Sequence, residues 1–491
     1  MHKAVPIVPL VALLAVGALA GCTGHKEPSA AQKAASESAV YDAVERAIGE
    51  PLRQDGFNAS RPAEMYLNRT ATLTGEDGRT PQPSEGYVES AVKGGYAYLC
   101  RTGPDEGLVV FDAKDVEHPK QVGYVKLDAG FEADVEVSDD GHWAFWATQR
   151  VGISAAAPDP SDPAGQAPRG IHIIDISDKA HPKWVGFTPV APDGPHSITF
   201  ATIGGQGYLF ASVYSWQYVG TSVGLPTLAP PGMQRLEIYR LDTSLPVARL
   251  VEVASYIDPD AVEENPVMPQ GGQFPHDVSI AVHPVTNRTY AYVAYWDLGV
   301  VILDVGDPAH PTRVGAATDF GEAPTKEIHM ARQSERRIDG KVVVVAEPEI
   351  GNQQTTGYMS MIDVTDPEHP SFISNWRIPG DADSAGGGRG PHYFDLANGR
   401  VVMASYAAGF WVFDIHDHAN LLHPRTVGYS TVKPASGAGS NLPFVGGGLG
   451  GGIAFDAWWA DATHVYGSES GNGLAVFRYT GPAPAIDELA S

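Results

Sequence analysis

The segment from Gly107 to Tyr124 recurs along the chain and constrains its fold more than any other feature. In this copy an apolar run ends in Asp112, a polar turn carries His118-Pro119, and a second short run opens at Gln121. Seven copies, of which the third and the last are degenerate, start 51 to 66 residues apart, at Gly107, Gly170, Leu236, Gly299, Tyr358, Gly409 and Gly473. Self-similarity at this period indicates stacked supersecondary units. The sequence therefore predicts one array of seven units.

Each unit is expected to contain four short strands, named A to D in chain order. In the first unit we expect them at 89–93, 96–100, 108–111 and 122–126, where β-branched and aromatic residues alternate between Gly, Asp and Pro. Four-stranded antiparallel units repeated around an axis form a β-propeller, and seven lie within the usual range of blade numbers. The sequence therefore predicts an all-β fold, a seven-bladed β-propeller over residues 65–480.

The last unit has no fourth strand of its own. Its strands A, B and C are expected at 454–458, 464–467 and 474–479, and Gly-Pro-Ala-Pro follows them. The segment 66–74 (YLNRTATLT) precedes the first strand A and resembles the D strands of the other units. We therefore expect this N-terminal strand to complete the seventh blade and close the ring, which leaves only short sheet edges exposed.

The N-terminal residues predict export from the cytoplasm. An apolar run from Ala4 to Ala20 ends in small residues, which is typical of a secretory signal peptide. Its end, Leu19-Ala20-Gly21-Cys22, resembles a bacterial lipobox, and this resemblance implies cleavage before Cys22 and lipidation of its thiol. Ordinary secretion with an incidental Cys22 is the alternative. The predicted organisation is a lipoprotein signal peptide at 1–21, a tether at 22–35, a short helix and linker at 36–64, the propeller at 65–480 and a C-terminal tail at 481–491.

Two of the recurring copies resemble a known repeat family. GLVVFDAKD from Gly107 and GVVILDVGDP from Gly299 are similar to LVIVD repeats, which occur in bacterial and archaeal extracytoplasmic proteins and are described as β-propeller units. The resemblance implies the fold but no single activity. It agrees with a location in the cell envelope, lipid-anchored in the periplasm or at the cell surface. A net charge of -25 argues against nucleic acid as a partner, because a phosphate backbone would be repelled.

The 17 histidines include two sets with different expected roles. One set lies in the repeated turn, each member before a proline: His118, His181, His310, His369 and His423. These residues occur once per blade around the rim and cannot converge on one ion, so we interpret them as turn residues. The second set opens strand A of blades three to six: His196, His276, His329 and His392.

The second set of histidines predicts a metal site. Strand A is innermost in a propeller, and its first residue lies at the face that carries the long B–C and D–A loops. Four imidazoles from adjacent blades should therefore surround one side of the axial mouth. Neutral imidazole is the commonest protein ligand for several transition metals, and we expect iron or copper here. The alternative is that each histidine bonds to a neighbouring loop and fills the channel mouth.

Two further groups of residues are expected around these histidines. Carboxylates on the same face could accept the second ring N–H of a metal-binding histidine; the candidates are Asp277, Glu327, Glu347, Glu349 and Glu469. Aromatic residues near the end of strand B could form the wall of an apolar pocket; they are Tyr214, Trp216, Tyr295, Trp296 and Tyr406. The arrangement resembles the axial histidine sites of seven-bladed carotenoid oxygenases and, more loosely, those of copper-dependent selenium-binding-protein propellers. This likeness is architectural.

Two functions are open at this point. The first is an extracytoplasmic, membrane-anchored oxidoreductase that uses iron or copper to act on a small apolar or aromatic substrate. The second is a non-catalytic cell-surface scaffold whose long-loop face binds a protein or a glycan. The sequence contains no P-loop, HExxH or CxxC motif that would favour another chemistry.

Overall fold

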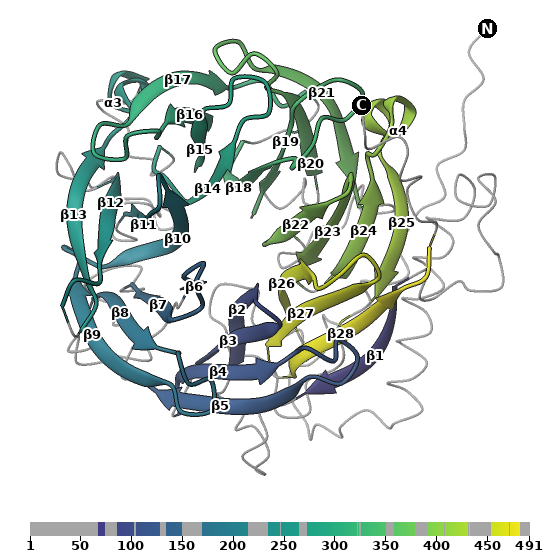
Figure 1. Cartoon of the computed structure of the whole chain (residues 1–491). Coiled ribbons are helices and arrows are strands. Elements are labelled where there is room, and N and C mark those ends of the chain that lie inside the picture. Colours follow the sequence, from purple (N-terminus) through teal and green to yellow (C-terminus); the bar gives the residue numbers. More distant parts are fainter. Residues whose placement is uncertain are drawn as a thin grey trace, which may run out of the picture.

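The chain forms a ring of seven blades around a central axis (Figure 1). The computed structural model describes residues 67–73, 86–102, 105–127, 134–149, 169–214, 234–245, 247–264, 273–321, 323, 326–349, 358–378, 390–406, 408–430, 432, 453–470 and 472–481. Within them are seven four-stranded antiparallel sheets, which confirms the predicted all-β, seven-bladed propeller. The predicted signal peptide, lipidation site, tether and helix within residues 1–64, and nearly all of the tail, lie outside the described residues.

The first six blades each use four consecutive strands. Blade one contains β2 (Gly86–Lys93), β3 (Tyr96–Thr102), β4 (Gly107–Asp112) and β5 (Lys120–Lys126). Blade two contains β6 (Val135–Val137), β7 (Trp143–Thr148), β8 (Gly170–Asp175) and β9 (Lys183–Pro189). Blade three contains β10 (Pro195–Ile203), β11 (Gln206–Val213), β12 (Arg235–Asp242) and β13 (Arg249–Tyr256), followed by the short helix α3 (Pro259–Glu264).

The remaining blades follow the same order. Blade four contains β14 (Asp277–Val282), β15 (Thr289–Tyr295), β16 (Gly299–Asp304) and β17 (Thr312–Ala317). Blade five contains β18 (Ile328–Gln333), β19 (Val343–Pro348), β20 (Tyr358–Asp363) and β21 (Ser371–Arg377). Blade six contains β22 (Phe394–Ala397), β23 (Arg400–Ser405), β24 (Gly409–Asp414), the helix α4 (His418–Leu422) and β25 (Arg425–Ser430). Among the helices in the described ranges, none is long and apolar enough to cross a membrane.

The recurring segment corresponds to strands C and D of a blade. Strand C is largely buried because neighbouring blades cover both of its faces; all six residues of β16 are buried. The glycine that opens the segment is required by a close backbone approach. At Gly299, φ is 118°, and a Cβ would lie 2.2 Å from the Ala317 carbonyl oxygen on β17. The repeated glycine thus allows strand D to pair tightly with strand C.

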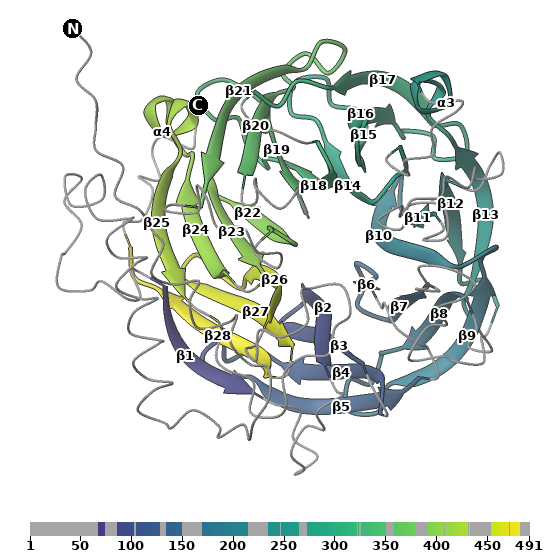
Figure 2. The ribbon, with the colours of Figure 1, turned by 180° about the vertical axis from the view of Figure 1, so that it is seen from behind.

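The ring is closed by the N-terminal strand, as predicted. β1 (Leu67–Leu73) pairs antiparallel with β28 (Gly473–Tyr479), which forms blade seven together with β26 (Ile453–Trp459) and β27 (His464–Ser470). Figures 1 and 2 show β1 beside β28 at the outer edge of this blade.

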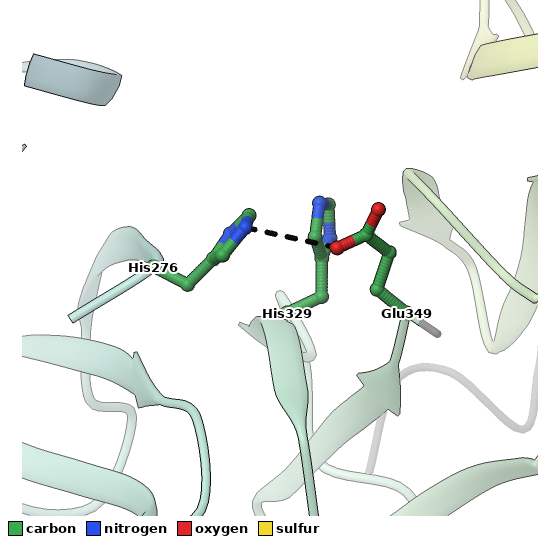
Figure 3. A group of neighbouring side chains, drawn as sticks. All are labelled: His276, His329 and Glu349. Carbon is green, nitrogen blue, oxygen red and sulfur yellow. Dashed lines mark ion pairs between the residues drawn. The ribbon is translucent and has the colours of Figure 1, made fainter. Parts of the chain in front are cut away.

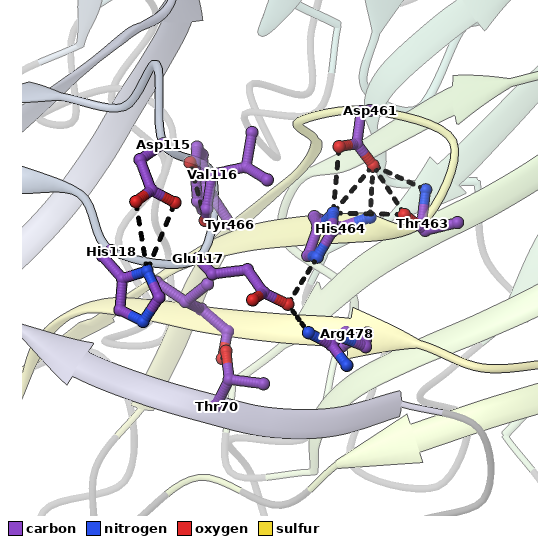
Figure 4. A network of polar contacts seen from close by, with 11 residues as sticks. Thr70, Asp115, Val116, Glu117, His118, Asp461, Thr463, His464, Tyr466 and Arg478 are labelled. Carbon is purple, nitrogen blue, oxygen red and sulfur yellow. Dashed lines mark hydrogen bonds and ion pairs between the residues drawn. The ribbon is translucent and has the colours of Figure 1, made fainter.

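A polar network also joins blade one to blade seven. Glu117, in the turn after β4, forms ion pairs with Arg478 of β28 and with His464 of β27, the latter at 3.2 Å (Figure 4). The two ends of the array are therefore held together by side chains as well as by the β1–β28 ladder.

The turn histidines have the structural role expected of them. In four of the five turns, the backbone N–H of the histidine bonds to the carbonyl of the aspartate three residues earlier, at 3.0–3.1 Å. Nδ1 of the ring lies 2.9–3.2 Å from the same aspartate's carboxylate. The fifth, His423, caps α4 instead, and its N–H bonds to the Ala419 carbonyl at 2.9 Å.

The seven innermost strands line a cavity of about 500 Å³ on the axis. These strands are β2, β6, β10, β14, β18, β22 and β26 (Figures 1 and 2). Acidic residues on them tie each blade to the next. Asp134 of blade two accepts the Ile198 N–H of blade three at 2.6 Å, and Asp456 of blade seven accepts the Ser90 N–H of blade one at 3.0 Å. The acidic lining is thus partly structural.

Candidate metal centre

The four histidines of the second set lie next to one another at the start of the inner strands. His196 is the second residue of β10 and His329 the second residue of β18, whereas His276 directly precedes β14 and His392 lies shortly before β22. Successive ring centroids are 4.3 Å apart between His196 and His276, 4.2 Å between His276 and His329, and 4.7 Å between His329 and His392. The radial geometry of the fold therefore brings together imidazoles that are far apart in sequence.

Hydrogen bonds to Nδ1 orient two of these rings. Nδ1 of His196 lies 2.8 Å from Oε1 of Gln149, and Nε2 of that glutamine donates to the Tyr214 carbonyl at 2.7 Å. The Gln149 oxygen is therefore an acceptor, and His196 donates to it through Nδ1–H. His392 donates Nδ1–H to the Phe455 carbonyl at 2.8 Å. In both residues the lone pair is then on Nε2, as in a metal-binding histidine.

The third ring has a carboxylate partner, as predicted for a histidine held by an acid. Nδ1 of His329 lies 2.7 Å from Oε1 of Glu347, and both side chains are buried. Among the described residues, no hydrogen bond is made to Nε2 of His329. The contact with Glu347 fixes the orientation of the ring.

His276 is different, because neither of its ring nitrogens makes a hydrogen bond of normal geometry to another described residue. The residue is only 1% exposed. A buried polar atom without a partner costs about 1–3 kcal/mol, so an unpaired imidazole here requires an explanation. The charged group facing it is Glu349, whose Oε2 lies 3.8 Å from Nε2 of His276.

Two imidazoles and one carboxylate meet at this point. His276, His329 and Glu349 each offer a ligand atom, and these atoms all lie within 4.8 Å of one another. Figure 3 shows the three side chains turned toward a common space, from the residues before β14, from β18 and from the end of β19. Ligand atoms on one first-row ion lie up to about 4 Å apart, since each is about 2 Å from the metal. Small side-chain rotations would therefore suffice to bind an ion.

Burial favours the neutral form of three of the imidazoles. It lowers the pKa of His276 and of His329 well below the usual value, with the neighbouring histidines adding to the effect. It lowers the pKa of His392 to about 3. Burial, together with the nearby Glu349, raises the pKa of Glu347 well above its usual value. The environment thus favours uncharged nitrogen ligands.

The five predicted carboxylates have different positions. Glu347 contacts Nδ1 of His329, whereas the Glu349 carboxylate lies close to the ring nitrogens of His276 and His329. Asp277 lines the axial cavity, where burial raises its pKa to about 6. The carbonyl of Glu327 accepts the Glu349 N–H at 3.2 Å, and Glu327 has a φ of 39°.

The Glu469 carboxylate has a partner that the sequence did not suggest. It forms an ion pair with Arg69 of the closing strand β1, and both side chains are buried. Blade seven has Phe455 where blades three to six have histidine, so this acid serves ring closure instead.

Three of the five predicted aromatic residues contact the histidines. Tyr214 lies 4.9 Å from His196, Trp296 lies 5.0 Å from His276, and Tyr406 lies 4.9 Å from His392, measured between ring centroids. Tyr295 points into the core of its blade instead, where its hydroxyl accepts the Asp258 N–H at 3.2 Å. Trp216 lies outside the described residues.

One blade position supplies most of the groups around the histidines. The residue directly after strand B in blades two to six is Gln149, Tyr214, Trp296, Glu349 and Tyr406. We call these five residues the strand-B ring. Comparing strand-B ends across the repeats would have found Gln149, which the sequence analysis missed. It also missed Phe274 and Tyr393, whose rings lie 5.1 Å from Trp296 and 4.8 Å from His329, respectively.

Comparison with known families agrees with the repeat assignment. Residues 167–187 and 288–319 match the LVIVD repeat. The first match covers β8 and most of β9, and the second covers β15, β16 and β17. The chain is a β-propeller with LVIVD repeats. The resemblance expected from the sequence is thus confirmed, and strands C and D form the core of the repeat.

Solved structures similar to this LVIVD-repeat propeller are distant. A functionally unknown protein from Desulfotomaculum acetoxidans is 15% identical, with a TM-score of 0.43 over 70% of this chain and 84% of that one. The Cps50 (Swd1) β-propeller domain from Myceliophteria thermophila is 10% identical, with a TM-score of 0.49 over 84% and 100%. A Lactobacillus plantarum protein is 12% identical, with a TM-score of 0.45 over 70% and 85%. A search of curated proteins finds no match.

Proposed function

We propose that the histidine cluster binds a transition metal and that the protein is a metal-dependent oxidoreductase. The observation that carries this proposal is the buried His276, whose ring nitrogens make no hydrogen bond of normal geometry to a described residue, while it lies between His196 and His329 and faces Glu349. Hydrogen bonds on Nδ1 of the other three histidines leave Nε2 available to a metal. Histidines that only filled the channel mouth would not need Nδ1 hydrogen bonds that leave Nε2 available.

The donor set favours iron, with copper as the second candidate. Two imidazoles and one carboxylate with open positions are typical of non-haem iron(II) oxygenases, and His276, His329 and Glu349 provide these groups. His196 and His392 flank the trio and could occupy further positions. A site of imidazoles alone would suit copper equally well.

The surrounding residues suit oxidation of a small apolar or aromatic substrate. A bound iron would supply one-electron chemistry and a position for dioxygen or substrate. The protein would hold the metal through neutral imidazoles, exclude water from the site by burial, and orient a substrate against aromatic rings such as Tyr214 and Trp296.

We also propose that the propeller works outside the cytoplasm. The apolar run before Cys22 supports an exported, lipid-anchored protein in the periplasm or at the cell surface, with the membrane as a partner through the anchor. Labelling with a radioactive fatty acid, in wild type and in a Cys22→Ser variant, tests the anchor. Label in wild type alone is expected, and label in neither protein would contradict lipidation.

The metal site is tested by elemental analysis of protein purified without an affinity tag of histidines. We expect about one iron or copper per chain in wild type and none in a His276→Ala/His329→Ala variant. The matched control is His310→Ala/His369→Ala, which removes two exposed turn histidines from the same two blades and should retain the metal. Absence of metal from wild type, even after reconstitution with Fe²⁺ or Cu²⁺, would refute the proposal and favour the non-catalytic scaffold.

A further inference from the structure

We propose that Tyr406 is a positioning residue for the metal site, holding the Glu349 carboxylate so that one oxygen faces the metal. The inference rests on the proposed metal-binding function and names a contact that controls it. Sequence patterns suggested only that Tyr406 forms part of an apolar wall, whereas its hydroxyl makes a specific polar contact.

The contact divides the two oxygens of the carboxylate between two tasks. The Tyr406 hydroxyl donates to Oε1 of Glu349 in a short hydrogen bond. Oε2 of the same carboxylate lies 3.8 Å from Nε2 of His276, on the side of the candidate ligands. A carboxylate held through one oxygen is directed to bind a metal through the other. This would leave more coordination positions open than bidentate binding.

Tyr406 is itself held firmly, as a positioning residue must be. It is 6% exposed, and its ring lies 4.9 Å from His392 and 5.6 Å from Phe455. Its carbonyl accepts the Ala454 N–H of the next blade at 3.0 Å. Its φ is 33°, an uncommon value for a bulky residue, and such strain is often found at functional sites.

The contact crosses between blades, since Glu349 follows β19 of blade five and Tyr406 follows β23 of blade six. Because His276 belongs to blade four, the Glu349 carboxylate of blade five lies between residues of the two neighbouring blades.

The expected effect follows from what such partners do at other metal sites. Loss of a group that orients a ligand typically lowers metal affinity about 10–100-fold. Tyr406→Phe removes the hydroxyl and keeps the ring that packs on His392 and Phe455. Tyr239→Phe is the matched control, because Tyr239 is also buried and also donates its hydroxyl to a carboxylate, that of Glu237 in blade three.

A Co²⁺ titration of the metal-free full chain separates positioning from a general structural effect. The visible absorption of Co²⁺ reports both affinity and coordination geometry. The proteins are wild type, Tyr406→Phe, Glu349→Gln, the double variant and Tyr239→Phe. We expect Tyr406→Phe to weaken binding about 10–100-fold and to change the Co²⁺ spectrum, but to have no further effect in the Glu349→Gln background.

The outcomes of this titration are distinct. Equal losses from Tyr406→Phe in both backgrounds, an unchanged affinity, or an equal loss in Tyr239→Phe would overturn the positioning role while the metal site stands. Failure of wild type to bind Co²⁺ would overturn the metal site and the positioning role with it. Urea unfolding of each metal-free variant verifies that the compared proteins are folded.

Discussion

Replacing Arg69 with alanine should destabilise the whole propeller, because this residue anchors the closing strand. Arg69 of β1 forms an ion pair with Glu469 at the end of β27; their side chains are 8% and 0% exposed. Its guanidinium also lies over the Phe477 ring, 4.7 Å from the centroid. Removing one partner of a buried pair leaves the other charge without its counter-ion in a low dielectric, which typically costs about 3–5 kcal/mol.

The size of this loss can be checked against an exposed pair in blade one. Lys114 and Asp112 lie 3.4 Å apart, with side chains that are 61% and 35% exposed. Such an exposed pair is screened by solvent and contributes little to stability, so Lys114→Ala should have a small effect. Urea is the suitable denaturant because it is uncharged, and tryptophan fluorescence reports the transition.

A second substitution tests whether the stability lost in Arg69→Ala comes from the buried charge of Glu469. Neutralising Glu469 as well, in Arg69→Ala/Glu469→Gln, should recover part of the stability, because the double variant no longer buries a carboxylate whose arginine partner has been removed. The reasoning would be refuted if Arg69→Ala and Lys114→Ala shifted the urea midpoint equally. That result would mean that β1 is not part of the cooperative core.

Three further predictions concern closure, protonation and ligand orientation. Deleting residues 65–76, which contain β1, should abolish the cooperative thermal transition seen by circular dichroism, and an unchanged melt would count against ring closure. Burial lowers the pKa of His392 from 6.5 to about 3. In metal-free protein, the stability that depends on its neutral form is therefore complete above pH 6.5 and decreases as the pH falls toward 3. The free energy of unfolding of a non-titrating His392→Asn variant, relative to that of wild type, should rise by about 1.4 kcal/mol for each pH unit below 6.5, or by about 2 kcal/mol at pH 5. A difference in urea unfolding that does not depend on pH would contradict this. Gln149→Leu removes the acceptor of the His196 Nδ1–H and should weaken Co²⁺ binding about 10-fold, whereas unchanged affinity would show that His196 is not a ligand.

The fold could be predicted because its rules are local and repeated. Seven units carry a recognisable strand C, five of them open it with glycine, and four carry the Asp-x-x-His-Pro turn, so individually weak signals reinforce one another. The missing strand of the last unit and the spare strand at 66–74 then required closure between chain start and chain end. The grouping of the four histidines follows from the same radial rule, since each begins an inner strand.

The details of the site depend on contacts that no repeat pattern encodes. Tyr295 and Trp296 are adjacent aromatics, and only the positive φ of Trp296 decides which ring stacks on His276. Glu347 lies near the end of β19 and Glu349 directly follows the strand, yet Glu347 contacts Nδ1 of His329 whereas Glu349 faces Nε2 of His276. Glu469 lies in the equivalent region of blade seven but faces Arg69 of a strand more than 390 residues away in sequence.

The central claim is that His276, His329 and Glu349 hold a metal ion, and anomalous X-ray diffraction tests it most directly. Crystals of protein loaded with Fe²⁺ would be measured on both sides of the iron absorption edge. We predict one strong anomalous peak about 2 Å from a ring nitrogen of His276, from Nε2 of His329 and from a carboxylate oxygen of Glu349. A peak elsewhere in the molecule, or a fully loaded crystal with none between these three side chains, would contradict it.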